Sequence, residues 1–399
     1  MSDVYIAGID MLKFGRLPEK TVPQLGADAA LLALEDAGLT IQDMEALYCG
    51  NLMQASAMVG QRVLHEIGQT GIPAYNVANA CATGATAIRT VYLTIKAGEA
   101  DMGLAVGVEQ MGKMGLLGGA GTKKEKHVFE PGGRFGAVTG VDGYLGTEGM
   151  PGVFAQAGME YANEYDGVGF EQFAKVAYKN HKHSVLNPLA QYRKEFSMEE
   201  IMGGPTMSYP NTLLMCCPTG DGAAAVVLVS GERLKSMPKK VQKRAVKISA
   251  SVLTSDPYTE ASQVQPDVNT LTQNAAAKAY DIAGVGPDDL DLVELHDCFA
   301  TAELIHYDNL GLCEKGGAGD FIDSGAPFRD GTTPVNVSGG LISKGHPIGA
   351  TGVANVYEVA THLRGEAGDR QIKGAKVGLA HVIGLGSACG IHILEKSGV

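Results

Sequence analysis

Two six-residue segments with the same ending occupy matching positions in this chain, and they constrain its fold more than any other feature. The sequence C-A-T-G-A-T begins at Cys81, and H-P-I-G-A-T begins at His346. Each follows an apolar run that starts with Asn-Val, at Asn76 and Asn336, and each leads into small residues typical of a helix start. A thiol and an imidazole therefore stand at the same place in two matching strand-to-helix turns.

The position of these two side chains predicts their charge state. A helix N-terminus has unpaired N–H groups and roughly half a positive charge, which favours a thiolate over a thiol. We therefore expect the pKa of Cys81 to be lowered. If the two turns lie close together, His346 would hold the thiolate as an ion pair and prepare it for attack on an acyl group.

The repeat extends beyond the two turns. The sequence A-L-E-D-A-G-L-T from Ala33 matches A-Y-D-I-A-G-V-G from Ala279, and L-A-V-G-V-E from Leu104 matches L-A-H-V-I-G from Leu379. Apolar strand-like runs alternate with helical patterns in both copies, which favours mostly parallel sheets covered by helices. The sequence thus predicts an α/β fold of two duplicated halves. If the sheets of the two halves stack with helices between them and on both outer sides, the molecule has five layers. A pseudo-twofold axis between the halves would then bring the two turns together.

The segment between the two copies does not repeat. Long insertions in compact domains are usually functional, often as a cap over the site, although a purely structural excursion is the alternative. The predicted division is a first half from 1–111 and 220–245, an inserted loop region from 112–219, and a second half from 246–399. The walls of a substrate pocket are expected from the first part of the insertion, at Met111, Met114, Phe135 and Met150.

Composition and charge narrow the function classes. The chain has 399 residues and a formal charge of −12, which argues against nucleic acid or an anionic membrane as the main partner, although a local basic patch for an anionic cofactor remains open. Neither a signal peptide nor a membrane span is evident, so we expect a cytoplasmic protein. The seven cysteines lack paired C-x-x-C spacing. Reduced thiols are expected, with neither a disulfide framework nor a metal site.

Three clusters supply a set of groups suited to carbon–carbon chemistry on thioesters. Cys81 can attack an acyl thioester to form an acyl-enzyme. In H-D-C-F, Cys298 can exchange a proton at the carbon next to a thioester carbonyl, which is general acid–base work. His296 and His346 can donate hydrogen bonds to a developing enolate. Backbone N–H groups at Cys81 and in the turn at Gly384 can form a second oxyanion hole.

These motifs resemble those of the thiolase superfamily over the whole chain. The resemblance rests on C-A-T-G, H-D-C-F, N-V-S-G-G-L-I-S-K-G-H-P-I-G-A-T-G and the C-terminal G-L-G-S-A. It is strongest to the branch of sterol carrier protein x thiolases and their archaeal relatives, in which H-D-C-F replaces N-E-A-F. The resemblance implies a nucleophile at Cys81, its activating residue at His346, the acid/base at Cys298, and oxyanion-hole donors at His296 and Gly384.

One departure from the family pattern shapes these assignments. Many thiolases carry a second cysteine in a C-x-G turn, but Val382 stands at that position here. Cys389 lies in an apolar run and is expected to be a buried inert thiol. Asp297 is expected to cap or orient its loop. The remaining cysteines, Cys216 and Cys217 among them, are interpreted as structural.

The N-V-S-G-G loop and the lysine that follows it leave alternatives open. By resemblance, Ser338 and Gly339 line the tunnel for the pantetheine arm of coenzyme A, but Ser338 could instead simply stabilise the turn. Lys344 could form an ion pair with a phosphate group of coenzyme A, or its side chain could be solvated. The sequence does not decide between these alternatives.

The leading hypothesis is a thiolase that cleaves a 3-oxoacyl-CoA with coenzyme A as co-substrate, or runs the reverse condensation, with no permanently bound cofactor. A decarboxylating condensing enzyme similar to ketoacyl synthases is the alternative, because Cys81, His346 and His296 also fit that reaction. A third possibility is a thiolase-like subunit active only with a small zinc-ribbon and OB-fold partner. The family implies a homodimer. Short-chain, 2-methyl-branched, steroid side-chain and aromatic acyl groups all remain open.

Overall fold

Helices and strands alternate along the chain in the computed structural model, which describes residues 3–112, 150–257, 268–385 and 387–398. The first half comprises β1 (Val4–Met11), α1 (Val22–Ala37), β2 (Leu47–Gly50), α2 (Val59–Ile67), β3 (Ala74–Val77), α3 (Thr83–Ala97), β4 (Met102–Gln110) and β7 (Asp221–Ser230). The intervening segment includes α5 (Met150–Glu164), α6 (Phe170–Ser184), α7 (Met198–Met202), β5 (Thr206–Ser208) and β6 (Asn211–Thr212). After α8 (Gly231–Lys235) and α9 (Lys239–Arg244), the second half comprises β8 (Val246–Thr254), α10 (Val268–Ala283), β9 (Leu292–Glu294), α11 (Ala300–Asn309), α12 (Ala318–Asp323), α13 (Gly340–Lys344), α14 (Ile348–Arg364), β10 (Val377–Gly384) and β11 (Ala388–Lys396).

The strand order shows the duplication directly. The sheet runs β3-β2-β4-β7-β1-β8-β11-β10-β9, so both halves repeat one order outward from the centre. In place of a strand equivalent to β3, the second half has a single parallel bridge between Val335 and Val293. We expected two separate stacked sheets. Instead, β1 and β8 join the halves through two residue pairs, Tyr5 with Lys247 and Ile6 with Val246.

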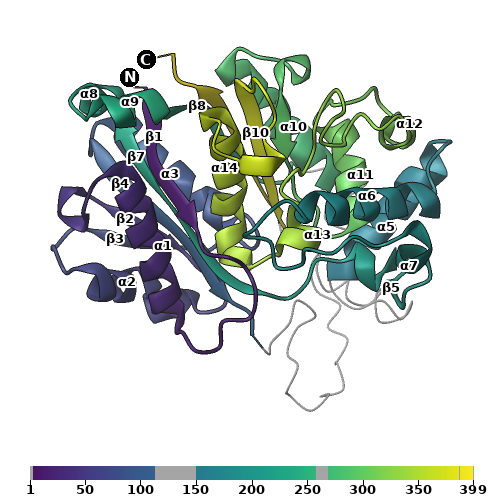
Figure 1. The fold of residues 1–399 in the computed structure, drawn as a ribbon, viewed down its shortest axis with the longest axis horizontal. Helices are drawn as coiled ribbons and strands as arrows, with labels where there is room; N and C mark the ends of the chain where they lie inside the picture. Colours follow the sequence, from purple (N-terminus) through teal and green to yellow (C-terminus); the bar gives the residue numbers. More distant parts are fainter. Residues whose placement is uncertain (1–2, 113–149, 258–267, 386, 399) are drawn as a thin grey trace.

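Helices lie on both sides of each half, which gives the five layers of the predicted fold. The helices α3 and α14 pack against each other between the two halves, and Figure 1 shows α14 at the centre of the molecule. A buried cluster that includes Ile88, Val226 and Val356 fills this central region. On the outside, α1 covers β1 and β7, and α10 covers β8 and β11. The five-layered α/β architecture predicted from the repeat is confirmed. The mostly parallel sheets expected with it are wrong: the sheet is mixed, and the β1–β7, β4–β7, β1–β8, β8–β11 and β10–β11 pairs are antiparallel.

Glycines let the two central helices approach at their N-termini. A Cβ atom on Gly84 would lie 2.8 Å from the carbonyl oxygen of Gly349, and one on Gly352 would lie 2.3 Å from the amide nitrogen of Ala85. Real side chains do not tolerate such contacts. Gly84 and Gly349 are the fourth residues of the two repeated sixes, so the repeated glycine is what allows the two turns to meet.

The inserted segment packs mainly on the second half. Phe154 of α5 and Phe173 of α6 belong to the same buried cluster as Ile305 of α11 and Val252 of β8. Figure 1 shows α5, α6 and α7 beside α11 and α13. The insertion therefore contributes to the core of the second half.

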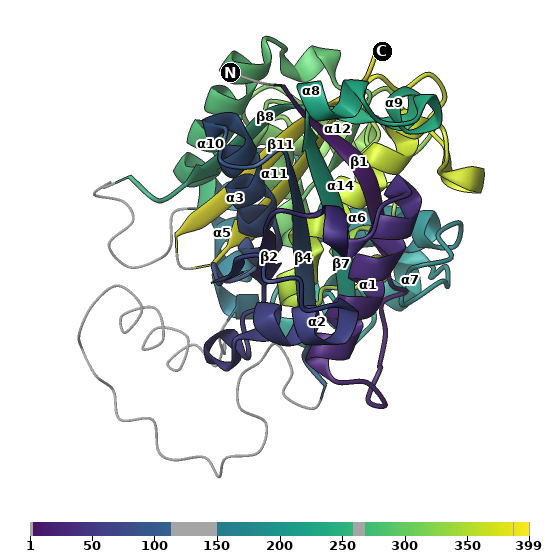
Figure 2. The ribbon, with the colours of Figure 1, turned by 90° about the vertical axis from the view of Figure 1, so that its left-hand side faces the viewer.

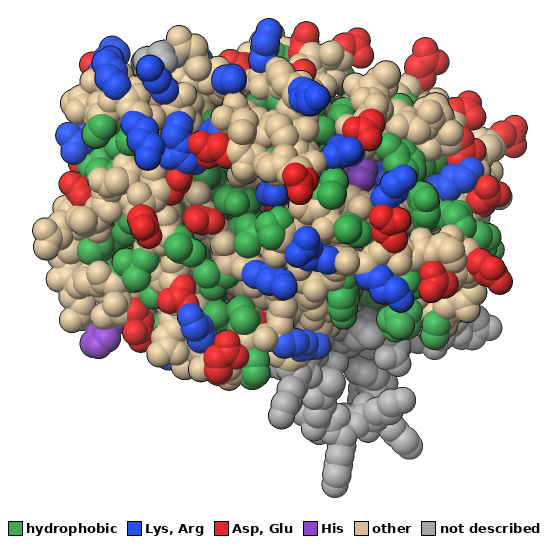
Figure 3. Space-filling model, in the orientation of Figure 1, with side chains coloured by type: hydrophobic (Ala, Val, Ile, Leu, Met, Phe, Trp, Pro, Cys, Tyr) green, Lys and Arg blue, Asp and Glu red, His purple; other side chains and the backbone are tan. Residues whose placement is uncertain are grey.

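A basic region lies on the face of the molecule that Figure 3 shows. Lys and Arg side chains gather over α8 and α9 (Figure 3), at the end of the molecule where both chain termini lie (Figures 1 and 2). Helix α13, which leads to His346, lies in the lower middle of the molecule in Figure 1, apart from α8 and α9 at the upper left. Among the described residues, no helix combines the length and apolar character needed to cross a membrane.

Candidate active site

Cys81 sits in a tight turn between β3 and α3. The preceding residue, Ala80, has a φ of 45°, in the left-handed region that non-glycine residues rarely adopt. Thr83 holds this turn, because its hydroxyl donates to the Ala80 carbonyl at 2.5 Å and accepts from the Asn79 N–H at 2.8 Å. The strained turn presents a sulfur that is almost fully buried at the start of the helix.

The structure brings Cys81 and His346 together. The sulfur of Cys81 lies 3.3 Å from Nε2 of His346, and both side chains are buried. Val382, which stands where many thiolases have a cysteine, packs in the same small apolar cluster as Cys81. The Cys81–His346 contact expected from the repeat is therefore present, and the family's second thiol would have lain beside it.

Thr351 fixes which nitrogen of His346 faces the thiol. Its hydroxyl lies 2.9 Å from the Pro347 carbonyl, to which it donates, and 2.7 Å from Nδ1 of His346. A hydroxyl has one proton, so Thr351 must accept from an N–H at Nδ1. Nε2 then carries the lone pair that faces the Cys81 thiol, and it can take the thiol proton.

Sequence reasoning missed Thr351, although a signal was present. Threonine is the last residue of both repeated sixes, at Thr86 and Thr351. Both hydroxyls donate to the carbonyl four residues earlier, that of Thr86 to Ala82 at 2.9 Å. Thr351 accepts from His346, which opens its six, whereas Thr86 accepts at 3.1 Å from Asn79, two residues before Cys81. The shared final threonine therefore holds a neighbouring side chain in each turn.

His296 and Cys298 follow β9 and complete the cluster. Donor atoms of Cys81, His296 and His346 all lie within 4.8 Å of one another. The rings of His296 and His346 meet edge to face, with centroids 5.1 Å apart. Cys298 is buried, and its pKa is raised well above the usual range by burial, with further contributions from the nearby Cys217 and Cys81. A nucleophile, two imidazoles and a second thiol thus converge.

Cys217 also lies beside this cluster. Cys216 and Phe299 form an antiparallel bridge, and the N–H of Cys217 donates to the Cys298 carbonyl at 2.9 Å, so Cys217 and Cys298 stand opposite each other. The sequence interpretation of Cys217 as structural gave no hint of this position. Two cysteines 81 residues apart in the chain become cross-strand neighbours only once the insertion is folded, so no local pattern could reveal the contact.

Gly384 lies directly against the Cys81 turn. A Cβ on Gly384 would come within 2.4 Å of the Asn79 carbonyl oxygen and 3.1 Å of the Ala82 nitrogen, so only glycine fits. The neighbouring Leu385 N–H forms a hydrogen bond with the Cys81 sulfur, which by itself lowers the pKa of that thiol. Backbone donors therefore do surround the reacting sulfur. The assignment of Gly384 as an oxyanion-hole donor stays a prediction.

The expected lowering of the pKa of Cys81 is wrong. Burial raises the pKa of Cys81 to about 12, and it lowers the pKa of His346 to about 3. The loss of solvation outweighs the helix terminus and the Leu385 N–H, because a charged sulfur is costly to remove from water. Both shifts favour a neutral thiol hydrogen-bonded to a neutral imidazole as the resting pair, in place of the expected ion pair.

This charge state predicts an optical result. A thiol whose pKa is raised stays protonated at every pH below that pKa, so we expect no thiolate absorbance from Cys81 at about pH 7. The measurement is the ultraviolet difference spectrum between the wild type and Cys81→Ala, followed as the pH rises towards the pKa of about 12. A thiolate band already present at neutral pH would show that the ion pair forms after all.

Ser338, Gly339 and Lys344 are buried in contacts of their own. The Ser338 hydroxyl donates to Glu294 at 2.5 Å, and a Cβ on Gly339 would lie 2.5 Å from that of Ser184. Lys344 is neither solvated nor exposed to a phosphate: its Nζ lies 3.6 Å from Glu294 and the side chain is fully buried. These contacts favour the alternative in which Ser338 stabilises the turn. Coenzyme A binding by Ser338 and Gly339 stays a prediction.

The predicted pocket walls are only partly described. Met111 is buried in the cluster around Cys81, and Met150 packs on the core of the second half. Met114 and Phe135 lie outside the described residues. A mostly apolar cavity of about 270 Å³ reaches Cys217, and its lining includes the following residues: His181, Tyr192, Phe196, Leu213, Leu214, Cys216, Pro218 and Ile342.

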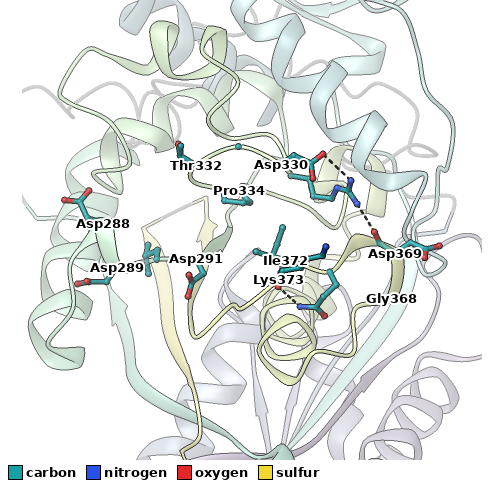
Figure 4. Close-up of a pocket in the computed structure, with 14 residues that line it drawn as sticks. Asp288, Asp289, Asp291, Asp330, Thr332, Pro334, Gly368, Asp369, Ile372 and Lys373 are labelled. Carbon is teal, nitrogen blue, oxygen red and sulfur yellow. Dashed lines mark hydrogen bonds and ion pairs between the residues drawn. The ribbon is translucent and has the colours of Figure 1, made fainter.

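A larger cavity, of about 760 Å³, lies away from this chemistry (Figure 4). None of Cys81, His296, Cys298 and His346 lines it. Its charged lining residues are Asp288, Asp289, Asp291, Arg329, Asp330, Asp369 and Lys373. An excess of aspartate disfavours a ligand with negative phosphate groups, so size alone does not make this cavity the site for an acyl-CoA.

Among the described residues, the one group of three or more His, Cys, Asp and Glu side chains spaced to hold a metal ion is Cys81, His296 and His346. A metal there would occupy the lone pair and the sulfur that the pair needs for chemistry. The prediction of an enzyme without a metal cofactor is therefore retained as a prediction.

Comparison with known proteins agrees with the motifs. Residues 4–204 match the family "Thiolase, N-terminal domain", and residues 256–396 match "Thiolase C-terminal domain-like". The chain is 39% identical to sterol carrier protein 2 of Rattus norvegicus, over 96% of this chain and 70% of that protein. It is 34% identical to the acetyl-CoA acetyltransferase of Methanothermobacter thermautotrophicus, over 99% of this chain and 100% of that protein.

A solved structure shares the fold at lower sequence identity. The complex described as "Ltp2-ChsH2(DUF35) aldolase" contains a chain with a TM-score of 0.82 and 22% identity, which covers 99% of this chain and 98% of its own. Both halves of the present chain and nearly all of its length therefore fit one architecture. The resemblance inferred from C-A-T-G, H-D-C-F and G-H-P is confirmed: the chain belongs to the thiolase family, whose substrates are coenzyme A thioesters, and is an acyltransferase of the thiolase type.

Proposed function

We propose that the chain cleaves a 3-oxoacyl-CoA through an acyl group carried on Cys81, and that the same residues run the reverse condensation. The observation that carries this proposal is the 3.3 Å contact between the Cys81 sulfur and Nε2 of His346, with His296 and Cys298 beside it. One nucleophile with one base accounts for acyl transfer. The second thiol accounts for the proton at carbon that cleavage also requires.

In the first half of the reaction, Nε2 of His346 takes the Cys81 proton as the sulfur attacks the 3-oxo carbon. Backbone N–H groups at Cys81 and in the Gly384 turn are the proposed donors to the resulting oxyanion. When the bond between carbons 2 and 3 breaks, its electron pair passes to the departing thioester as an enolate. His296 donates to the enolate oxygen, and Cys298 delivers a proton to carbon 2.

In the second half, coenzyme A takes the acyl group from Cys81. Its thiol gives its proton to the Cys298 thiolate and attacks the acyl carbon. Cys81 leaves and recovers the proton held by His346. The net result moves the thiol proton of coenzyme A to carbon 2 of the departing product, so protons and electron pairs balance without an oxidant or reductant.

Thr351→Val tests the role of the fixed tautomer. Valine has the same shape but leaves the Nδ1 proton of His346 without an acceptor, so the ring can adopt the tautomer that turns an N–H towards Cys81. We expect the rate of Cys81 acylation to fall by about 10- to 100-fold. The matched control is Thr361→Val in the same helix, whose hydroxyl donates to Tyr357 at 2.7 Å but contacts no catalytic group. Equal rates in both variants would remove Thr351 from the mechanism.

The apolar cavity beside Cys217 is the proposed path for part of the acyl-CoA. Aromatic and aliphatic side chains of the insertion, including Tyr192, Phe196 and Leu213, line it. Ligand sites are typically apolar with a few placed polar groups. Acyl specificity therefore depends on residues of the insertion, and the four acyl classes named above stay open.

The edge strand β3 is the proposed contact with a second copy of the chain. It ends the sheet, and Tyr75 within it is 48% exposed. Exposed edge strands with apolar side chains are usually covered in native proteins.

For an accessory subunit, the similarity to the chain of the Ltp2–ChsH2(DUF35) complex supports the proposal of a small zinc-ribbon and OB-fold partner. The cytoplasmic location stays a prediction.

A panel of 3-oxoacyl-CoA thiolysis assays tests the function. The purified chain is compared alone and with any small subunit that copurifies, using short-chain, 2-methyl-branched, steroid side-chain and aromatic substrates. Thiolysis by the chain alone supports a self-sufficient enzyme, and thiolysis only after the subunit is added supports an obligate complex. Loss of all thiolysis in both preparations would contradict the proposal.

A further inference from the structure

A cluster of fully buried charged and amide side chains lies behind the H-D-C-F loop. Lys179 and Asn180 come from α6 of the inserted segment, Glu303 comes from α11, and Asp297 stands between His296 and Cys298. The Nζ of Lys179 lies 2.7 Å from Oε1 of Glu303. None of these four side chains has a role in the reaction proposed above.

Asn180 uses all of its polar groups in this cluster. Its amide nitrogen donates to Asp297 at 2.8 Å and to Glu303 at 2.6 Å, and its oxygen accepts from Lys179 at 2.6 Å. An asparagine side chain has two N–H donors, so each carboxylate receives one of them. Asn180 thereby holds two buried carboxylates together that would otherwise repel each other.

Asp297 connects this cluster to the segment that carries His346. Its carboxylate accepts from the Leu341 N–H at 2.6 Å and from the Ile342 N–H at 3.2 Å, at the start of α13. A Cβ on Gly340 would lie 2.1 Å from Oδ2 of Asp297, and Gly340 has a φ of 59°. Only glycine permits this approach. The second glycine of N-V-S-G-G therefore serves the contact with Asp297.

We propose that Asn180 and Lys179 of the inserted segment are positioning residues for the thiolase reaction. They act through Asp297, which joins the loop of His296 and Cys298 to the helix that leads into His346. The inserted segment thus sets the distance between the acid/base thiol and the Cys81–His346 pair. This inference rests on the proposed roles of His296, Cys298 and His346.

The electrostatics of the cluster explain why the amide is needed. Burial, followed by the nearby Glu303, raises the pKa of Asp297 well above its usual range. The Leu341 and Ile342 N–H groups and the charge of Lys179 favour the charged carboxylate, and the Asn180 N–H adds a hydrogen bond to it at 2.8 Å. Without that donor Asp297 would more readily take up a proton, its hold on the N–H groups of α13 would weaken, and the two catalytic loops would no longer be fixed relative to each other.

Asn180→Leu is the direct test, because it removes the amide at nearly constant volume. We expect kcat for thiolysis to fall by about 100-fold, the cost of a misplacement of roughly 1 Å, with KM changed by less than about 3-fold. Exchange of the carbon-2 protons of acetyl-CoA with deuterated water should slow by a similar factor, because it depends on where Cys298 lies. A kcat within about 2-fold of wild type would overturn the proposal.

Gln242→Leu is the matched control for stability. Gln242 is also a buried amide, and it donates to the carbonyls of Lys235 and Met237 in the α8–α9 region. The stability of both variants is measured by unfolding in urea. If both lose similar stability, we expect kcat to fall in Asn180→Leu and to stay unchanged in Gln242→Leu. Equal losses of kcat in the two variants would show that Asn180 has only a structural role. Should Asn180→Leu fail to fold, Asn180→Ser leaves room for a bridging water and must still lower kcat. An inactive wild type would instead overturn the proposed function.

Discussion

Cys81→Ala should abolish acyl-enzyme formation and lower thiolysis by at least about 10⁴-fold, the scale of loss when a covalent nucleophile is removed. Alanine preserves the turn at Ala80 and the packing around it, so only the sulfur is lost. Intact-mass measurement after addition of a 3-oxoacyl-CoA should show an acyl adduct on the wild type and none on the variant.

Cys49→Ala is the control for this experiment. Cys49 lies in β2, is buried, and has a pKa raised by burial to about 12, as Cys81 has. It makes no contact with His346 in the described structure. This control should keep both the adduct and the thiolysis rate. An adduct on Cys81→Ala would place the acyl group on another side chain and contradict the assignment.

The large-scale fold was predictable because the sequence contains two similar copies of one unit. The matching segments at Ala33 and Ala279 lie in the helices α1 and α10. The matching segments at Leu104 and Leu379 lie in the strands β4 and β10, which occupy equivalent places in the sheet. The pairing of β1 with β8 could not be predicted in this way. It lies between the two copies, where the repeat contains no information about how one copy meets the other.

The pair Cys81–His346 was predictable for the same reason, whereas its charge state was not. Helix position is visible in a sequence, but the extent of burial is not, and burial decides the pKa of Cys81. The glycine pair Gly339–Gly340 shows a related limit. The family motif suggested that this loop lines a ligand site. In the structure, Ser184 and Asp297, from distant parts of the chain, leave no room for a Cβ atom on Gly339 and Gly340 respectively.

Cys298→Ala should separate acyl transfer from carbon–carbon chemistry. The Cys81–His346 pair remains intact in this variant, and the proton that His346 takes from Cys81 can pass to the leaving coenzyme A thiolate in place of the Cys298 proton, so transfer of an acetyl group from acetyl-CoA to Cys81 should slow much less than carbon–carbon cleavage. Cleavage of a 3-oxoacyl-CoA needs a proton at carbon 2 and should fall by about 100- to 10,000-fold, the usual contribution of general acid–base catalysis. Radiolabelled acetyl transfer and thiolysis, measured on the same preparation, give the two rates.

The same variant distinguishes the thiolase from a decarboxylating condensing enzyme. A decarboxylating enzyme forms its carbanion by loss of carbon dioxide and needs no second thiol, so Cys298→Ala would leave it active with a malonyl thioester. A thiolase should be inert with that substrate before and after the change. Cys389→Ala, which removes a buried thiol of β11 that contacts Thr272 of α10 and belongs to a different buried cluster from Cys81, should leave both rates unchanged. Retained thiolysis in Cys298→Ala would show that the proton comes from elsewhere, with His296 as the next group to test.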